Sequence, residues 1–169
     1  MTSVVKVDTI QNAAGTFEHA RLVQVVTQSY STQSTTTSTF PMDTSVPTKT
    51  EGAALTSLAI TPTNTNNTLI IDWNAPVTAN SSTGRDCYVL FKDDDTDAVQ
   101  ASWGEEDAGS YCYYEGFRHI VTGSLGTSEI EWKIRFGTNT GTMRMNSIDG
   151  SLTWGTTIHA TFTIMEIRA

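Results

Sequence analysis

The sequence predicts an all-β protein, an antiparallel sandwich of the jelly-roll kind. Its 169 residues include 30 Thr and 15 Ser, and Thr is favoured on half-buried pleated surfaces but disfavoured inside helices. No long stretch has apolar residues at i, i+3, i+4 and i+7, whereas alternation with a period of two is clear. Many short strands with turn residues at regular spacing are typical of a sandwich or jelly roll.

Residues 1–20 are expected to form an attachment arm ahead of a jelly-roll domain over 21–169. The arm carries a short apolar strand, Val4 to Ile10, and a turn that ends at Gly15. Twenty residues cannot bury a core, so this segment needs a partner or the main domain to order it. Residues 29–39, almost entirely Ser, Thr and Gln, fit a linker or an edge or interface strand.

The middle of the chain is divided into strands by turns rich in Asn, Ser, Thr and Gly. Strands are expected at 21–31, 55–61, 68–77, 86–92, 117–123 and 140–146. The turns lie at 61–67, 79–84, 123–126 and 137–141.

One strand, 87–91, is apolar in both phases. Cys87, Val89 and Phe91 fall on one face, and Tyr88 and Leu90 fall on the other. An antiparallel sandwich should leave one face wet, so a doubly apolar strand indicates that a second surface is covered. Either an arm folds over it, or it forms a subunit interface, for which Tyr88 and Leu90 are the candidate residues.

Two strands near the C-terminus alternate most clearly. In 129–136 every even residue is apolar and every odd residue is charged, which predicts one buried and one solvated face. The last strand, 156–167, is expected to bury its even-numbered apolar residues up to Ile164. The phase slips at 165–167, which predicts a bulge or the end of the strand.

The charge balance excludes several classes of partner. With 10 Lys and Arg against 18 Asp and Glu, the net charge is −8, which disfavours binding to nucleic acid and to anionic membranes. No apolar run is long enough to span a membrane, and the N-terminus lacks the pattern of a signal peptide. Folding in a cytosol is therefore expected, with Cys87 and Cys112 as free thiols.

No metal, cofactor or catalytic residue is predicted. Asp93, Asp95 and Asp97 have the spacing of the first ligands of a calcium loop, but Ala98 and Gly104 stand where that loop needs its turn glycine and bidentate glutamate. A solvated turn is the simpler interpretation. The chain has no Gly-x-Ser-x-Gly elbow and no phosphate-binding glycine loop, and its three histidines lack metal-ligand spacing.

Four aromatic residues, Trp103, Tyr111, Tyr113 and Tyr114, lie in a region rich in Gly, Ser and acidic residues. Aromatic side chains in loops suit stacking on sugars or anchoring protein contacts, because they supply a large area at low entropic cost. Alternatively, the tyrosines belong to another strand that packs on the sandwich.

The order of motifs resembles that of tailed-phage virion proteins, especially those of marine and cyanobacterial phages. The similar segments are the opening 5–15, the Val-Gln-Val-Val strand at 23–26, and 58–71. They continue with the Gly-Thr-Met-Arg-Met-Asn stretch at 141–146 and the terminal strand 163–167.

This resemblance implies a tumour-necrosis-factor-like or C1q-like jelly roll, usually trimeric, displayed on the surface of a virion and assembled in the host cytoplasm. The expected partners are its own copies and another virion protein, contacted through Val4, Val5, Val7 and Ile10 of the arm. The chain lacks a shaft of heptads, collagen-like repeats or β-helix repeats, which favours a compact knob or capsid decoration over a long tail fibre. Adsorption to a host glycan through the four aromatic residues is the alternative function, and an enzyme acting on surface polysaccharide is a third.

Overall fold

The computed structural model describes residues 11–12, 15–16, 22–79, 84–105, 112–147, 151 and 154–169. Its elements, all strands, are β1 (Gln11–Asn12), β2 (Gly15–Thr16), β3 (Leu22–Tyr30), β4 (Ser34–Thr36), β5 (Ala53–Ile60), β6 (Thr68–Ala79), β7 (Arg85–Lys92), β8 (Gln100–Glu105), β9 (Cys112–Thr122), β10 (Ile130–Thr138), β11 (Met143–Met145) and β12 (Ala160–Ile167). Within these ranges, no helix is long and apolar enough to cross a membrane.

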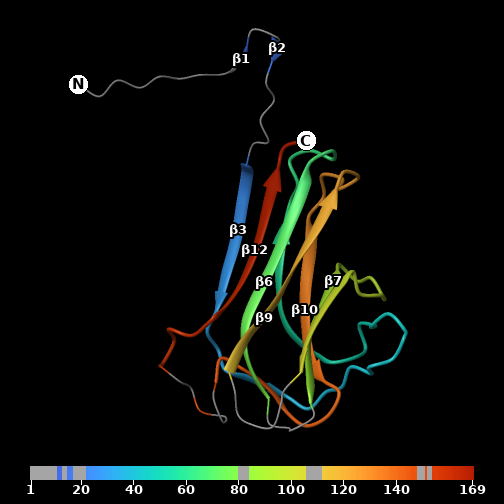
Figure 1. Ribbon diagram of the computed structural model, residues 1–169. Helices are drawn as coiled ribbons and strands as arrows, with labels where there is room; N and C mark the ends of the chain where they lie inside the picture. Colours follow the sequence, from blue (N-terminus) through green and yellow to red (C-terminus); the bar gives the residue numbers. More distant parts are fainter. Residues whose placement is uncertain are drawn as a thin grey trace, which may run out of the picture.

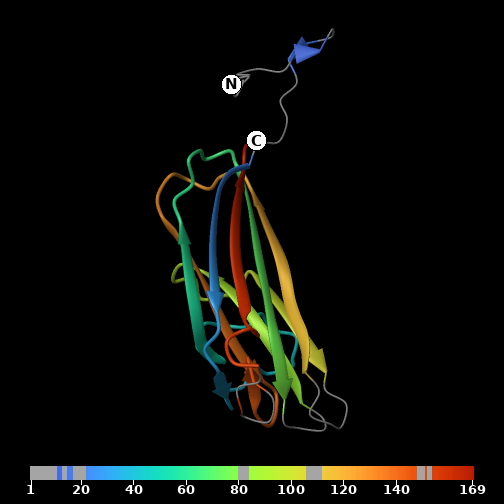
Figure 2. The ribbon, with the colours of Figure 1, turned by 90° about the vertical axis from the view of Figure 1, so that its left-hand side faces the viewer.

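The fold is an antiparallel jelly-roll sandwich of two sheets, with β1 and β2 paired separately as a short hairpin (Figure 1). The first sheet has six strands. Five are connected in the order β3-β12-β6-β11-β4, where β12 and β11 pair with successive parts of β6, and the sixth, β9, pairs along the other edge of β6. The second has four strands in the order β5-β10-β7-β8. Seen from the β3 side, β5 of the second sheet lies beside β3 of the first (Figure 2). The chain crosses repeatedly between the sheets, as in jelly rolls.

The last strand, β12, lies between β3 and β6. Its buried Glu166 accepts hydrogen bonds from Gln24 Nε2 (2.6 Å), Thr63 N (2.8 Å), Thr63 Oγ1 (2.9 Å) and Asn67 Nδ2 (2.6 Å). Burial alone raises the pKa of this carboxyl, but the hydrogen bonds outweigh it and hold the pKa below its usual value. Glu166 therefore ties the last strand to β3 and to the turn before β6.

The core lies between the two sheets and is centred on aromatic side chains. The Trp73 ring meets the Tyr88 ring at 5.4 Å and the Phe162 ring at 5.7 Å, both edge to face, an arrangement that adds to the stabilisation from burial. Tyr88 and Leu90 are 0 % exposed in this core. Because their own chain buries them, they are not surface residues that a partner could contact, which corrects their assignment to a subunit interface.

The opposite face of β7 is covered by residues 38–49, here called the strap. Phe40 of the strap packs with Cys87, Val89 and Phe91 in a second buried cluster. Backbone hydrogen bonds hold both ends of the strap, from Phe40 N to Thr138 O (3.2 Å) and from Lys49 N to Thr96 O (2.9 Å). This face is therefore covered by the same chain, but the covering segment is 38–49, within the jelly-roll domain, and not an arm.

Two glycines make room for the Phe40 ring. A Cβ at Gly52 would lie 2.1 Å from the ring, and one at Gly137 would lie 2.8 Å from it. Real side chains do not approach so closely, so the strap depends on a slot that only glycine leaves open.

The predicted strands are largely confirmed. β10 buries Ile130, Trp132, Ile134 and Phe136, and the bulge expected near 165–167 occurs between Glu166 and Ile167. β12 begins only at Ala160, after a turn at 154–157, and β11 is three residues long. The free thiols are also confirmed, with Cys87 buried and Cys112 exposed.

Within the two sheets, β8 was not expected, and neither were the two-residue strands β1 and β2, where only a turn was predicted. The sequence of β8, Gln-Ala-Ser-Trp-Gly-Glu, has no β-branched residue and contains a glycine, so its intrinsic preference for a strand is weak. The structure also extends β9 back to Cys112, so Tyr113 and Tyr114 belong to a strand and not to a loop.

Candidate assembly surface and groove

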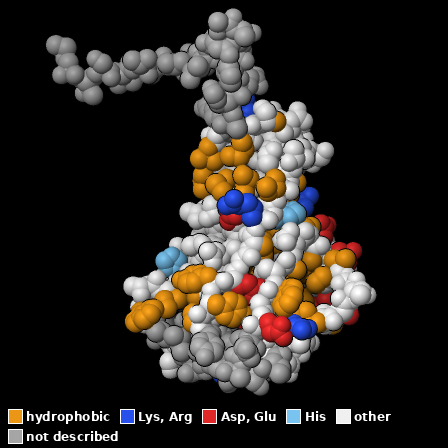
Figure 3. Space-filling view, in the orientation of Figure 1, with side chains coloured by type: hydrophobic (Ala, Val, Ile, Leu, Met, Phe, Trp, Pro, Cys, Tyr) orange, Lys and Arg blue, Asp and Glu red, His pale blue; other side chains and the backbone are white. Residues whose placement is uncertain are grey.

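The outer face of the six-stranded sheet carries a row of apolar side chains. Register places Val25, Met165, Ile70 and Ile120 side by side across β3, β12, β6 and β9. Val25 is 48 % exposed and Ile120 is 55 % exposed. Figure 3 shows hydrophobic side chains gathered at this end of the sheet, near the C-terminus. We call these four side chains the apolar row.

The next row along the same strands is polar. Thr27 Oγ1 and Thr163 Oγ1 share a hydrogen bond of 3.0 Å. Arg118 donates from Nε to Asp72 Oδ1 at 2.7 Å and from its terminal nitrogen to Asp72 Oδ2 at 3.0 Å. These bonds raise the pKa of Arg118 above its usual value. Because Arg118 is positive and Asp72 is negative, the row presents no net charge.

Beyond the polar row lies a groove of about 610 Å³, open to solvent. Tyr114, which is 62 % exposed, stands at one end, and the Arg118–Asp72 pair stands at the other. Between them, Gly116 has no side chain, and a Cβ there would lie 2.1 Å from the Trp73 carbonyl oxygen. The close approach of β6 and β9 thus requires glycine, and the missing side chain opens the groove.

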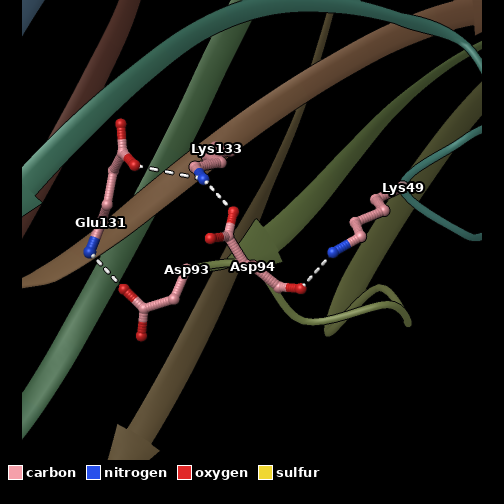
Figure 4. A network of polar contacts seen from close by, with 5 residues as sticks. All are labelled: Lys49, Asp93, Asp94, Glu131 and Lys133. Carbon is pink, nitrogen blue, oxygen red and sulfur yellow. Dashed lines mark hydrogen bonds and ion pairs between the residues drawn. The ribbon is translucent and has the colours of Figure 1, made fainter.

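The outer face of the four-stranded sheet has a second hollow, of about 400 Å³. Lys133 bridges Asp94 (2.9 Å) and Glu131 (3.2 Å), and Lys49 donates to the Asp94 carbonyl (2.5 Å). Asp93 Oδ1 accepts a hydrogen bond from Glu131 N at 2.8 Å. Figure 4 shows this network, in which the charged groups face one another. Within this network Lys133 is paired with two carboxylates, whereas Lys49 and Asp93 bond to backbone groups.

The acidic run at 93–97 is a turn. Asp93 has a positive φ of 49°, and Asp95 N donates to Lys92 O at 3.0 Å. Across the described parts of the chain, no group of three or more His, Cys, Asp or Glu residues could hold a metal.

A chelator should therefore leave folding unchanged. Thermal melts with and without EDTA should agree within about 2 °C, because a metal bound at 100-fold excess would contribute about 2.7 kcal/mol. A large drop in the melting temperature that added Ca²⁺ reverses would show that the acidic turn binds metal.

The four aromatic residues proposed for glycan binding do not form one cluster. Trp103 lies on the outer face of the four-stranded sheet, with the Arg85 guanidinium 5.4 Å from its ring. Tyr114 lies on the outer face of the other sheet, and Tyr113 packs against the core between the sheets. Tyr111 lies outside the described residues. Only Tyr114 borders the groove.

The attachment residues also fall outside the described residues. They are Val4, Val5, Val7 and Ile10, and their assignment stays a prediction.

A pair of buried acids was missed by the sequence reasoning. Glu115 of β9 is 7 % exposed and Asp86 of β7 is 0 % exposed, so they enter the core from opposite sheets. Neither carboxylate oxygen of Glu115 has a donor at hydrogen-bonding geometry among the described residues. Burial raises the pKa of Glu115 to about 8; the nearby Ser102 hydroxyl opposes this and the charge of Asp86 adds to it. The sequence could have indicated these buried acids, because each occupies an inward-facing position of its strand.

Comparison with known proteins gives a likeness in structure alone. No protein-family model and no curated protein matches the sequence, so nothing confirms the phage or tumour-necrosis-factor-like family. The structure of infectious bursal disease virus, Gx strain, has a TM-score of 0.46 and 13 % identity, over 100 % of this chain and 41 % of that one. The VP2 subviral particle of infectious bursal disease virus has a TM-score of 0.39 and 15 % identity, over 92 % and 40 %. The chain thus spans less than half of either, and a likeness this low carries no information on function.

Proposed function

We propose that the protein is a non-enzymatic structural component of a phage virion. It is a compact trimeric knob on the surface of the particle, a capsid decoration or short fibre, anchored by an arm over residues 1–20 and assembled in the host cytoplasm. The resemblance in sequence supports the virion assignment, and the jelly-roll topology suits such a knob.

The apolar row carries this proposal. Four neighbouring apolar side chains on a solvent-facing sheet are unusual for a protein that stays alone, and such patches mark interaction sites. Leu22 and Val23 of β3, 52 % and 37 % exposed, extend the patch. The occupant we propose is a second copy of the chain, because the resemblance implies a trimer and the charge of −8 disfavours a membrane.

Light scattering on the purified protein at micromolar concentration should give about three chain masses. The double variant Val25→Asp with Ile120→Asp should give monomers that keep the wild-type circular dichroism, because both positions are exposed. Val46→Asp, at a position 54 % exposed on the strap, is the matched control and should stay trimeric. A wild type that remains monomeric at high concentration would contradict the trimer.

Deleting residues 1–20 should leave a folded trimer that no longer incorporates into particles. The described core begins only at β3, and strand addition to a neighbouring protein would satisfy both the backbone and the apolar side chains of the arm. Val5, Val7 and Ile10 changed together to Asp should have the same effect, since each buried aliphatic contributes about 1.5–3 kcal/mol. If the truncated protein occupied particles normally, or if it unfolded, the attachment role of the arm would be refuted.

A second candidate function is adsorption to a host glycan. The groove beside Tyr114 is the observation that favours it.

A further inference from the structure

The geometry of the groove points to a binding site for a neutral saccharide on the six-stranded sheet, formed by Tyr114, Gly116, Asn74, Thr161 and the Arg118–Asp72 pair. We propose this site as a deepening of the second candidate function. Its Arg118–Asp72 end adjoins the apolar row. Tyr114 lies roughly 20 Å from that row, six residues along β9 at about 3.3 Å each, so variants of Tyr114 test the site apart from the trimer.

Tyr114 supplies the stacking surface. Its ring is 62 % exposed and borders the groove, where Gly116 leaves the space beside it empty. A pyranose ring presents a face of C–H bonds, and an exposed aromatic ring gives that face a large apolar contact at low entropic cost.

The polar lining matches hydroxyl groups. Asp72 of β6 offers acceptor oxygens, Arg118 of β9 offers donors, and Asn74 of β6 offers both, and all three line the groove. A sugar hydroxyl donates one hydrogen bond and accepts two, so neighbouring hydroxyls can engage both members of the ion pair. A few convergent polar groups beside an apolar surface are typical of ligand sites.

The charges select a neutral ligand over an anion. The guanidinium of Arg118 is already held by two hydrogen bonds to Asp72, at 2.7 and 3.0 Å, so it offers no net positive charge. The whole protein carries −8, which repels phosphate and acidic sugars. An apolar peptide is also disfavoured, because Asn74 and Thr161 make the floor polar.

Saturation-transfer NMR on the full chain tests the site with maltotriose, cellotriose, mannotriose and chitotriose, and with sialyllactose as the anionic comparator. At least one neutral trisaccharide should receive saturation, and sialyllactose should not. Tyr114→Ala should weaken binding about tenfold or more, and Asn74→Ala should also weaken it. Trp103→Ala is the matched control, because Trp103 is 58 % exposed on the other sheet, and it should bind as the wild type does.

Light scattering on each variant separates this proposal from the trimer, since Tyr114→Ala should keep the wild-type mass. The saccharide site is overturned if no neutral trisaccharide receives saturation. It is equally overturned if Tyr114→Ala binds unchanged, or if Trp103→Ala abolishes binding.

Discussion

The free energy of unfolding should fall as the pH rises from about 4.5 to about 8. In the folded chain the pKa of Glu115 is raised from 4.5 to about 8, so between these values the folded protein holds a proton that the unfolded chain releases. The stabilisation is complete below about pH 4.5 and lost above about 8, and its upper size is about 5 kcal/mol, at 1.36 kcal/mol per pKa unit. The groups that interact electrostatically with Glu115 are Asp86, Ser102, Tyr88 and Cys87.

Glu115→Gln should abolish this slope and leave a protein more stable than the wild type at pH 8, because glutamine is neutral at every pH. Urea unfolding at pH 5, 6.5 and 8 measures the effect. Glu129→Gln, at an exposed position, is the control and should keep the slope. Glu166 acts in the opposite direction: its lowered pKa means that its stabilisation is lost below about pH 4.5. A Glu115→Gln protein with the wild-type slope would show that the buried acid does not govern it.

Phe40→Ala should destabilise the protein by about 3–5 kcal/mol, the usual cost of truncating a buried phenylalanine. Phe40 is 2 % exposed, and its ring covers Cys87, Val89 and Phe91. The truncation leaves a cavity and also loosens the strap, so the Cys87 thiol should become reactive to a thiol reagent. Burial holds the pKa of that thiol at about 12, and renewed contact with water should lower it.

Equilibrium unfolding in urea compares this variant with Val46→Ala. Val46 lies on the same strap but is 54 % exposed, so its truncation should change the free energy of unfolding by less than about 0.5 kcal/mol. Equal stability of the two variants would mean that the strap contributes nothing to the fold.

The sequence predicts those strands whose two faces differ. Ile130, Trp132 and Ile134 alternate with charged residues, so one face of β10 could be assigned to the core directly. β8 was not predicted because none of its inward residues, Gln100, Ser102 and Gly104, is apolar. For β7, apolar residues in both phases could show that two surfaces were covered, but not that Phe40 covers one of them.

The candidate surface could not be predicted in the same way, because it depends on register. Val25, Ile70, Ile120 and Met165 are scattered through the sequence and meet only when four strands align. The prediction of an aromatic cluster was wrong for a related reason. Trp103 and Tyr114 are eleven positions apart in the sequence, but the chain passes from one sheet to the other between them, so proximity in sequence did not become proximity in space.

The central place of β12 has a consequence for synthesis. Residues 160–167 leave the ribosome after every other described strand of the two sheets, yet they fill the gap between β3 and β6. Until then the nascent chain has two unpaired strand edges and an open core, and such species are prone to aggregate. The larger sheet therefore cannot close before residue 167 has left the ribosome, and the yield in the cell should depend on how soon β12 inserts or on a chaperone that shields the gap.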